Sequence, residues 1–402
     1  MQNSSAPALY ITGLGSQYPP YLLGAKDLDN LAARFYDVTR PGIKKLLQVN
    51  RTTGIDTRSA VRPYKAFATQ TDPPSISEID QFFRQAGVDL AVQACQKALI
   101  EAHIAPQQIT HTIGVTCTNQ GNPGYDFLVA RKLNLPPHVD RMLLHGVGCA
   151  GGLSILRAAA QIAGGASLRR KPARILAFAC ELCTPNVRHC LSMAERSMDS
   201  DQANIAAALF SDAAAAFVLC NEHAMTQDKQ VTPQFELLEW GCDLVPGTAE
   251  LTIRTKFRLH IYIGYRATLS RHIPEYTKHA IRPMFERLLP LYEEQLKCQP
   301  RLGGQLLRPL GIHDFDWALH PGGKAIIDGV AEVLQLSEDQ LQATWEIYRT
   351  RGNSSSASVL IVLDQLRSES KRTHIVATSF GPGLAIEMAL LRRCQVDDNL
   401  EG

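Results

Sequence analysis

Short apolar runs that end in glycine and lead into helical patterns recur along this chain and restrict the folds it can adopt. TIGVTCT (112–118) and ARILAFACEL (173–182) are strand-like, and LSILRAAAQIAGG (153–165) between them predicts a buried helix that ends at its glycine pair. ALFSDAAAAFVLC (208–220) predicts a turn that leads into a strand of small residues. This alternation of strands and helices favours an α/β protein with buried sheets.

The second part of the chain repeats this order. FDWALH (315–320) is strand-like, and KAIIDGVAEVLQL (324–336) predicts a helix with apolar residues on one face. RGNSSSASVLIVLDQL predicts a further helix after Asn353, and HIVATSFGPGLAIEMALL (374–391) predicts a strand, a tight glycine turn and a strand. From a length of 402 residues, we expect two fused halves or one large α/β unit, and we place the boundary between the halves near residues 221–234.

Composition agrees with a globular protein and argues against nucleic-acid binding. Hydrophobic residues make up 45% of the chain and charged residues 20%, and the charged helical segment 274–296 is predicted to cover the outside. A formal net charge of +2 is too mild for a nucleic-acid partner. The basic residues Lys44, Lys45, Arg51 and Arg58 could still meet an anionic ligand.

The sequence also argues against a membrane span and against secretion. No apolar run approaches the roughly 20 residues that cross a bilayer, and MQNSSAPAL lacks a basic stretch followed by a long apolar core. Ten scattered cysteines, mostly inside apolar segments, are typical of core residues in a reducing compartment rather than of a disulfide framework. We therefore expect a cytoplasmic protein.

Cys149 lies in the glycine-rich stretch HGVGCAGG (145–152), between a predicted strand end and a predicted helix start. A thiol in this place meets the positive end of the helix dipole and free backbone N–H groups, which favour the nucleophilic thiolate. The glycines let a substrate approach the backbone closely. The alternative is that the glycines serve helix packing and that Cys149 is one more buried thiol.

His320 and Asn353 are the other candidates for chemistry. His320 ends a predicted strand, and the following Pro321, Gly322 and Gly323 stiffen the chain and open space beside the imidazole. This suits a positioned acid or base, although a lone histidine at a strand end is often structural, and we take the remaining histidines as structural. Asn353 is either the N-cap of its helix or an amide donor to a developing oxyanion.

Cys180 and Cys183, in CELC, have the spacing of some metal and redox sites. No second CxxC pair and no histidine cluster accompanies them, and their segment is strand-like. We therefore predict no metal site.

Four motifs, GVGCAGG, DWALHPGGKAIIDGV, RGNSSSASVLIVLDQL and SFGPGL, occur in that order and together resemble the type III polyketide synthases, the chalcone synthase superfamily. The resemblance runs from about residue 9 to 393. It implies a thiolase-like fold, an α/β fold in which two pseudo-repeated βαβ halves form an αβαβα layered core. Residues 9–225 would carry the nucleophilic cysteine, and residues 226–395 the catalytic histidine and asparagine. The resemblance also implies a homodimer.

The resemblance implies a role for each candidate. Cys149 matches the family nucleophile, His320 the catalytic histidine and Asn353 the catalytic asparagine, and Phe210 matches an aromatic gate between the substrate tunnel and the cavity. Cys149, paired as a thiolate with His320, would take an acyl group from CoA. His320 and Asn353 would hold malonyl-CoA while carbon dioxide leaves, and the enolate would attack the bound chain. This chemistry needs no cofactor, metal or carrier protein.

Residues that bind CoA are assigned through the same resemblance. Lys45 matches a CoA-binding lysine, but Gln48 and Thr52 stand where plant members have basic residues. Arg51 lies next to the second of these positions and is assigned to CoA as well. The other residues assigned to CoA are Gly322, Gly323 and Ala325.

The substrate pocket departs from the plant pattern. Cys183 and Asn186 replace threonines that line the plant cavity, and Asn122 replaces a methionine that reaches into the neighbouring subunit's cavity. A second gating phenylalanine aligns loosely with Leu259. The other residues assigned to the substrate pocket are Phe210, Gly381 and Pro382.

The segment ERSMDSDQANIAAALFSDAAAA looks like that of fungal or bacterial members, which often accept medium or long fatty acyl starters. We therefore expect an aliphatic acyl-CoA starter and an alkyl pyrone or alkylresorcinol-type product. The coupling of two β-keto acyl units, as in some relatives, stays open. Starter length, the number of extensions and the mode of ring closure depend on a cavity volume that many side chains shape.

Three rival functions are less favoured. A ketoacyl synthase III shares the fold and the Cys, His, Asn set, but its histidine motif usually differs from the HPGG found at 320–323. Papain-like hydrolases carry a tryptophan-flanked cysteine, and a nucleophile elbow needs glycine where this chain has Val147. A scaffold with an inactive thiolase fold would be expected to have lost one of the three catalytic residues, and all three are present.

Overall fold

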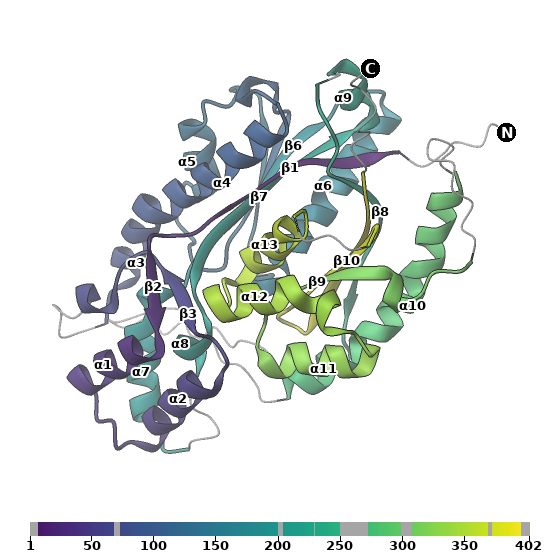
Figure 1. Ribbon diagram of the computed structural model, residues 1–402. Coiled ribbons are helices and arrows are strands. Elements are labelled where there is room, and N and C mark those ends of the chain that lie inside the picture. Colours follow the sequence, from purple (N-terminus) through teal and green to yellow (C-terminus); the bar gives the residue numbers. More distant parts are fainter. Residues whose placement is uncertain are drawn as a thin grey trace.

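A nine-stranded sheet with the order β5-β4-β6-β7-β1-β8-β11-β10-β9 forms the centre of the molecule (Figure 1). The structure is a computed structural model, which describes residues 7–67, 73–199, 204–228, 230–249, 272–298, 308–368 and 372–394. The strands of the sheet are β1 (Leu9–Gln17), β4 (His111–Val115), β5 (Asp140–Leu144), β6 (Arg174–Leu182), β7 (Asp212–Asn221), β8 (Phe235–Leu244), β9 (Phe315–Leu319), β10 (His374–Gly381) and β11 (Ala385–Arg393). A separate two-stranded sheet pairs β2 (Tyr21–Gly24) with β3 (Thr57–Ala60).

The same succession of strand pairings occurs on both sides of the sheet centre. On one side β4 is parallel to β6, β6 is antiparallel to β7, and β7 is antiparallel to β1. On the other side β9 is parallel to β10, β10 is antiparallel to β11, and β11 is antiparallel to β8. β1 and β8 join the two sides through a short antiparallel ladder that includes Leu9↔Leu237, and β5 extends one edge. The two sides therefore form one continuous sheet.

The central strands are buried on both faces, which explains their nearly continuous apolar sequences. Along β6, Ile175 and Ala177 pack into the core between the two sides of the sheet, whereas Leu176 and Phe178 pack into an outer core. The alternation follows from the period of two in a strand. The four alanines of β7, at 213–216, have small side chains and point alternately into the same two cores.

Helices complete five layers. α6 (Gly151–Leu168) and α13 (Ser358–Gln365) contact each other and strands of both sides, so they form the central layer. α4 (Val88–Glu101) and α5 (Tyr125–Lys132) cover the outer face of one side, and α10 (Ile273–Cys298) and α11 (Lys324–Leu334) cover the other side (Figure 1). This is the αβαβα arrangement of the thiolase-like fold, which confirms the predicted fold class. The predicted division at residues 225 and 226 stays a prediction.

Further helices surround this core. They are α1 (Ala25–Phe35), α2 (Pro41–Thr52), α3 (Ile76–Phe82), α7 (Val187–Arg196), α8 (Ala206–Leu209), α9 (Glu222–Gln227) and α12 (Gln342–Arg351). α1, α2, α7 and α8 share a small apolar cluster that includes Leu28, Leu46 and Leu191. Together with β2 and β3 they form the lobe at the lower left of Figure 1.

Most predicted segments are confirmed, with differences at their ends. The helix predicted to stop at its glycine pair continues through Gly164 and Gly165 to Leu168 and ends where Arg170 adopts a left-handed conformation, so that prediction is wrong. An added Cβ at either glycine would meet no other atom, so neither position forces a break. The strand predicted over 112–118 ends at Val115, because the N–H of Cys117 donates to a carboxylate instead of continuing the ladder.

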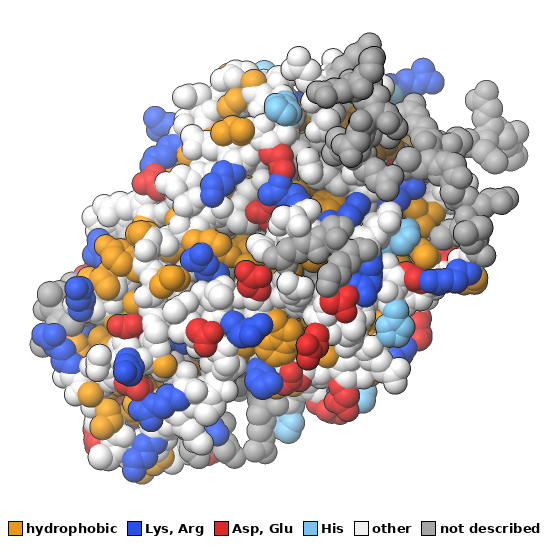
Figure 2. Space-filling model, in the orientation of Figure 1, with side chains coloured by type: hydrophobic (Ala, Val, Ile, Leu, Met, Phe, Trp, Pro, Cys, Tyr) orange, Lys and Arg blue, Asp and Glu red, His pale blue; other side chains and the backbone are white. Residues whose placement is uncertain are grey.

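Charges of both signs lie close together on the face shown in Figure 2. On this face, lysine and arginine side chains alternate with aspartate and glutamate side chains rather than forming a basic stripe. This agrees with the small net charge of +2. Within the described residues, no helix has both the length and the apolar character needed to cross a membrane.

Candidate active site

Cys149 lies in a tight turn that leads into the central helix α6. The 3-10 turn η4 (Gly148–Ala150) follows β5 and continues directly into α6, so the thiol lies at the positive end of that helix. Gly148 has a φ of 51°, and an added Cβ there would lie 2.6 Å from Cδ of Pro382. Only glycine fits this position without strain or overlap. The glycine-rich sequence around Cys149 therefore shapes the turn that presents the thiol.

His320 lies immediately after β9 and is almost fully buried, with 2% of its surface exposed. Its backbone N–H donates to the carbonyl of Thr378 at 2.9 Å, which holds the residue in line with the sheet. Its imidazole lies against Gly322, where an added Cβ would be 3.2 Å from Cδ2 of the ring. Nδ1 has no hydrogen-bond partner among the described residues. The glycine after the histidine therefore leaves the room that the sequence analysis expected.

The side-chain amide of Asn353 forms hydrogen bonds at both of its ends. Its Oδ1 accepts a hydrogen bond at 2.8 Å from the N–H of Ser355, the first residue of the 3-10 turn η9 (Ser355–Ala357), which precedes α13 and has Ser354 as its N-cap. Its role as a donor to an oxyanion stays a prediction. Its Nδ2 donates to the carbonyl of Gly322 at 3.3 Å. Since Gly322 also supports the imidazole of His320, the two residues from the second part of the chain meet at this glycine. Ser355 then links Asn353 to Cys149.

Burial governs the ionisation of the cysteine and the histidine. It raises the pKa of Cys149 to about 11 and lowers the pKa of His320 to about 3. Both shifts disfavour the charged form of an isolated group in an apolar surrounding. Burial by itself therefore favours the neutral thiol and the neutral imidazole, so a nucleophilic thiolate has to be stabilised by an opposite charge or by hydrogen-bond donors.

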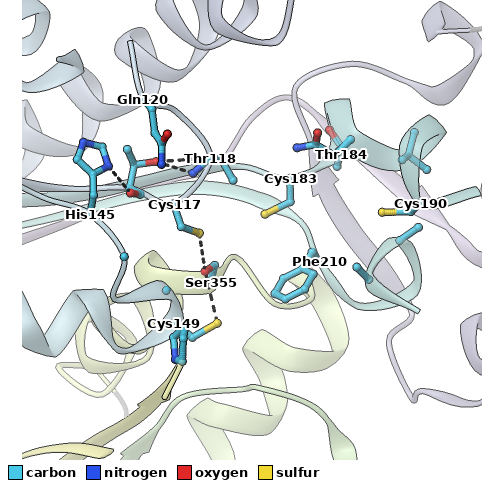
Figure 3. Close-up of a pocket in the computed structure, with 18 of the residues that line it drawn as sticks. Cys117, Thr118, Gln120, His145, Cys149, Cys183, Thr184, Cys190, Phe210 and Ser355 are labelled. Carbon is cyan, nitrogen blue, oxygen red and sulfur yellow. Dashed lines mark hydrogen bonds between the residues drawn. The ribbon is translucent and has the colours of Figure 1, made fainter. Parts of the chain in front are cut away.

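A cavity of about 240 Å³ opens in front of Cys149. Four thiols lie in its wall, those of Cys117, Cys149, Cys183 and Cys190. The other lining residues are Tyr64, Thr116, Thr118, Gln120, His145, Gly146, Gly148, Thr184, Asn186, Val187, Ala206, Ala207, Phe210, Ser355 and Pro382. In Figure 3 the sulfurs of Cys117 and Cys149 both point to the hydroxyl of Ser355, while Cys183, Cys190 and Phe210 lie across the cavity.

The residues predicted for the substrate pocket fall into three groups. Phe210, Cys183, Asn186 and Pro382 line the cavity. Gly381 lies behind it, where an added Cβ would be 2.5 Å from the carbonyl oxygen of Val147. Asn122 is exposed and does not line the cavity of its own chain, and Leu259 lies outside the described residues.

The residues predicted to bind CoA lie on α2 and at the start of α11. Lys45 and Arg51 are on α2, and Gly322 and Gly323 precede α11, whose first turn holds Ala325. Arg51 forms an ion pair with Asp29 at 3.0 Å and remains largely exposed. A phosphate that binds Arg51 would therefore compete with this carboxylate. Their assignment to CoA stays a prediction.

Three further residues of the site were not expected from the sequence: the buried carboxylate of Glu181, Ser355, whose hydroxyl lies 3.4 Å from the sulfur of Cys149, and Cys117, whose sulfur lies 3.5 Å from the same hydroxyl. Glu181 accepts hydrogen bonds from Thr118 Oγ1 at 2.7 Å and from Ser356 Oγ at 2.5 Å, as well as from the N–H of Cys117. It therefore ties the loop after β4 to the turn before α13. Its signal in the sequence was a single acidic residue inside the apolar run 173–182.

Comparison with protein families matches both parts of the chain. The N-terminal domain of chalcone and stilbene synthases matches residues 46–222, and the C-terminal domain of the same family matches residues 293–395. Together these matches cover well over half of the chain.

Comparison with individual proteins gives the same result. "Type III polyketide synthase pspB" of Penicillium soppii is 65% identical over 99% of this chain and 100% of the relative. "Acylalkylpyrone synthase csyB" of Aspergillus oryzae is 33% identical over 95% of this chain and 94% of the relative. A solved structure of a type III pentaketide synthase from Neurospora crassa superposes with a TM-score of 0.87 at 36% identity, covering 96% of this chain and 100% of that one.

Proposed function

The chain belongs to the chalcone and stilbene synthase family and is a type III polyketide synthase, and from this premise we propose that it extends a fatty acyl starter bound to Cys149 and releases a cyclised product. Cys149 attacks the thioester of an acyl-CoA, a new C–S bond forms, and CoA leaves as its thiol. Malonyl-CoA then loses carbon dioxide, and the resulting enolate carbon attacks the Cys149 thioester. A C–C bond forms while the bond to Cys149 breaks, which leaves the extended chain as a CoA thioester. Cys149 attacks this thioester, a new C–S bond forms, and CoA leaves as its thiol before the next round.

One observation carries this proposal: Cys149, Asn353 and His320, from three distant segments, are joined through Ser355 and Gly322 at one buried place. The amide Nδ2 of Asn353, which donates to the carbonyl of Gly322 in this structure, is a donor of the kind that stabilises a developing enolate. The neutral imidazole of His320 can supply a second donor or accept a proton. These roles need no metal and no cofactor in the site.

An aliphatic starter is supported by the space around the thiol. The cavity of about 240 Å³ lies below the roughly 300–1,000 Å³ of typical small-molecule sites. A second cavity of about 350 Å³, whose wall includes Ile76 and Ile79, shares the lining residues Thr118 and Gln120 with the first. The rest of the second cavity's wall is formed by Ser77, Asp80, Asn119 and Gly121, so Ile76 and Ile79 are its apolar part.

The test is to incubate the protein with malonyl-CoA and acyl-CoA starters from two carbons to long fatty chains, and to identify the products by mass spectrometry. We expect cyclised polyketides from aliphatic starters with the unaltered protein and none with Cys149→Ala. Cys298→Ala is the matched control, because Cys298 is an exposed thiol at the end of α10. If no starter gives a condensation product, the proposal in its free-CoA form is wrong, and carrier-bound substrates are the next to test.

A second candidate is the coupling of two β-keto acyl units. It is favoured by the printed name of the Aspergillus relative, since an acylalkylpyrone carries one acyl and one alkyl substituent. Two different fatty acyl-CoAs supplied together distinguish the candidates. Coupling gives products whose mass contains both chains, whereas simple extension gives only products that contain one.

A homodimer is proposed as the working form. β5 lies at one edge of the sheet, where Met142 is 41% exposed, whereas β9 at the opposite edge is buried along its whole length. An open edge strand presents unpaired N–H and C=O groups that a second copy can occupy. Light scattering tests this, with Met142→Lys expected to shift the protein towards monomer.

A further inference from the structure

Two thiols in the cavity wall share one hydroxyl. Ser355 Oγ lies 3.4 Å from the sulfur of Cys149 and 3.5 Å from the sulfur of Cys117. In Figure 3 the two sulfurs approach this oxygen from opposite sides. Because a serine hydroxyl has a single proton, it can donate to only one of the two sulfurs at a time and can accept from the other.

The ionisation of Cys117 affects which sulfur accepts the hydrogen bond from Ser355. Burial, and next the negative charge of Glu181, raise the pKa of Cys117 well above its usual value, so Cys117 remains a neutral thiol. Its S–H faces two acceptors, the carboxylate of Glu181 and Ser355 Oγ. In the arrangement in which Cys117 donates to Ser355 Oγ, the O–H of Ser355 points to the sulfur of Cys149 and donates to it.

The backbone conformation of Ser355 is strained for any residue that has a side chain. Ser355 has a φ of 51°, a left-handed conformation that glycine adopts freely and that other residues adopt with strain. The residue has nevertheless a hydroxymethyl group, and that group contacts both sulfurs. Its N–H separately holds the amide of Asn353, and this backbone contact would persist with any residue at this position.

We propose that Ser355, oriented by Cys117, donates a hydrogen bond to the sulfur of Cys149 and thereby stabilises the thiolate that begins the reaction. This inference deepens the proposed function, since it concerns the nucleophile of the same site. A hydrogen bond to a charged group is worth about 1.5–3 kcal/mol, which corresponds to a change of about one to two units in the pKa of the acceptor thiol.

Other titratable groups near Cys149 also affect the ionisation of its thiol. Glu181 on β6 raises the pKa of Cys149, while the hydrogen bond from Ser355 lowers it. Cys183, just after β6, is a neutral thiol across the cavity, since burial raises its pKa well above the usual value. The remaining titratable groups of the site are His320 at the end of β9 and His145 in the loop before Cys149. Of the nearby groups, Ser355 donates to the sulfur without carrying a charge of its own.

The experiment is the rate of iodoacetamide alkylation of Cys149 between about pH 6 and pH 11, followed by mass spectrometry of the peptide that carries this cysteine. Because the pKa of Cys149 is about 11, its midpoint is obtained from the log-linear rise of the rate with pH, and a midpoint higher by one unit appears as an about tenfold slower alkylation at each lower pH. Ser355→Gly and Ser355→Ala both remove the hydroxyl, and glycine suits the observed φ, so at least one variant is free of added strain. We expect the midpoint for Cys149 to rise by about one pH unit in both variants. The exposed Cys298 in the same molecule serves as an internal reference whose midpoint stays unchanged.

Variants of neighbouring residues complete the test. Ser354→Ala is the matched control, because the hydroxyl of Ser354 lies 3.1 Å from that of Ser358 and makes no hydrogen bond to a cavity thiol among the described contacts. Cys117→Ser keeps a donor beside Ser355 and is expected to preserve the midpoint. Cys117→Ala removes that donor and is expected to raise the midpoint by less than the Ser355 variants do.

Two results would overturn the proposal. One is an unchanged midpoint for Cys149 in both Ser355 variants, and the other is an equal rise in Ser354→Ala. Alkylation uses no acyl-CoA, so the measurement keeps its meaning even if no condensation product forms. A failure of the proposed function and a failure of this inference can therefore be told apart.

Discussion

The two turns that lead into the central helices have similar shapes and different chemistry. The cysteine turn, Gly148–Ala150, leads into α6, and the serine turn, Ser355–Ala357, leads into α13. Both are single 3-10 turns, and the first residue of each has a φ of 51°. In the cysteine turn that residue is glycine, as the conformation favours, whereas in the serine turn it is a serine.

This difference shows what each turn can tolerate. At Gly148 a Cβ would lie 2.6 Å from Pro382, so a side chain is excluded by contact as well as by conformation. At Ser355 the side chain has room, and its hydroxyl reaches both Cys117 and Cys149. The cysteine turn is therefore shaped by packing, while the serine turn holds a strained residue whose side chain serves the neighbouring turn.

The largest expected effect comes from making the cysteine turn resemble the serine turn. Gly148→Ser adds backbone strain and an overlap with Pro382, and we expect it to lower the free energy of unfolding by about 3–4 kcal/mol. Urea denaturation measures this change, and condensation activity is expected to fall with it because the thiol of Cys149 is displaced. A loss below about 1 kcal/mol would show that Pro382 moves aside easily.

The next effect tests how closely the two turns are packed. An added Cβ at Gly152, in the first turn of α6, would lie 2.5 Å from the carbonyl oxygen of Ser356 in the serine turn. We expect Gly152→Ala to cost about 2–3 kcal/mol of unfolding free energy. Gly164→Ala, in the same helix with open space around it, is the control and is expected to be neutral or stabilising.

A smaller effect comes from the carboxylate that ties the two turns together. Glu181→Gln places an amide NH₂ among hydrogen-bond donors, and we expect it to cost about 1–2 kcal/mol. Burial raises the pKa of Glu181 above its usual 4.5, so the folded protein binds this proton more tightly than the unfolded chain does. The protonated carboxyl of Glu181 therefore stabilises the folded protein fully below pH 4.5, and this stabilisation is lost as the pH rises through the pKa that Glu181 has in the folded protein. Because glutamine does not ionise, the Glu181→Gln variant has no such pH-dependent loss.

The unaltered protein and Glu181→Gln should therefore differ most in unfolding free energy at acidic pH. Urea midpoints for the unaltered protein and Glu181→Gln, measured at several pH values from mildly acidic to neutral, test this expectation. The gap between them should narrow as the pH rises. A gap that widens would show that the ionised carboxylate is the form that the fold favours.

The smallest expected effect is the reverse exchange in the serine turn. Ser355→Gly relieves the left-handed strain but also makes the unfolded chain more flexible, and we expect the unfolding free energy to change by no more than about 0.5 kcal/mol. Urea denaturation beside Gly148→Ser makes the comparison direct. Equal losses in the two variants would contradict the distinction drawn between the turns.

Much of the fold and the three central site residues could be predicted from the sequence. The apolar runs over 173–182 and 315–320 are strands because both of their faces are buried, which leaves a clear signal. Cys149, His320 and Asn353 were identified through local glycine and serine patterns and through the family resemblance. Local patterns of this kind can be recognised in a single sequence, because they do not depend on contacts between distant segments.

Contacts between distant segments leave no such signal. Cys117 and Ser355 are 238 residues apart in the chain, and nothing in TIGVTCT indicates that its cysteine meets a serine near Asn353. The left-handed conformation of Ser355 was also hidden, because sequence patterns associate that conformation with glycine. The continuation of α6 through Gly164 and Gly165 was missed for the opposite reason, since glycine suggested a break that tertiary packing overrides.

The position of β1 in the sheet has a consequence for how the protein is made. β1 pairs with both β7 and β8, and its Thr12 contacts Val218, 206 residues later in the chain. At about 5–20 residues per second, a ribosome needs roughly ten to forty seconds to supply these partners after β1 has emerged. During that interval β1, with its apolar residues Leu9, Ile11 and Leu14, is unpaired. Translation speed and chaperone supply should therefore set the yield of active enzyme in a foreign host.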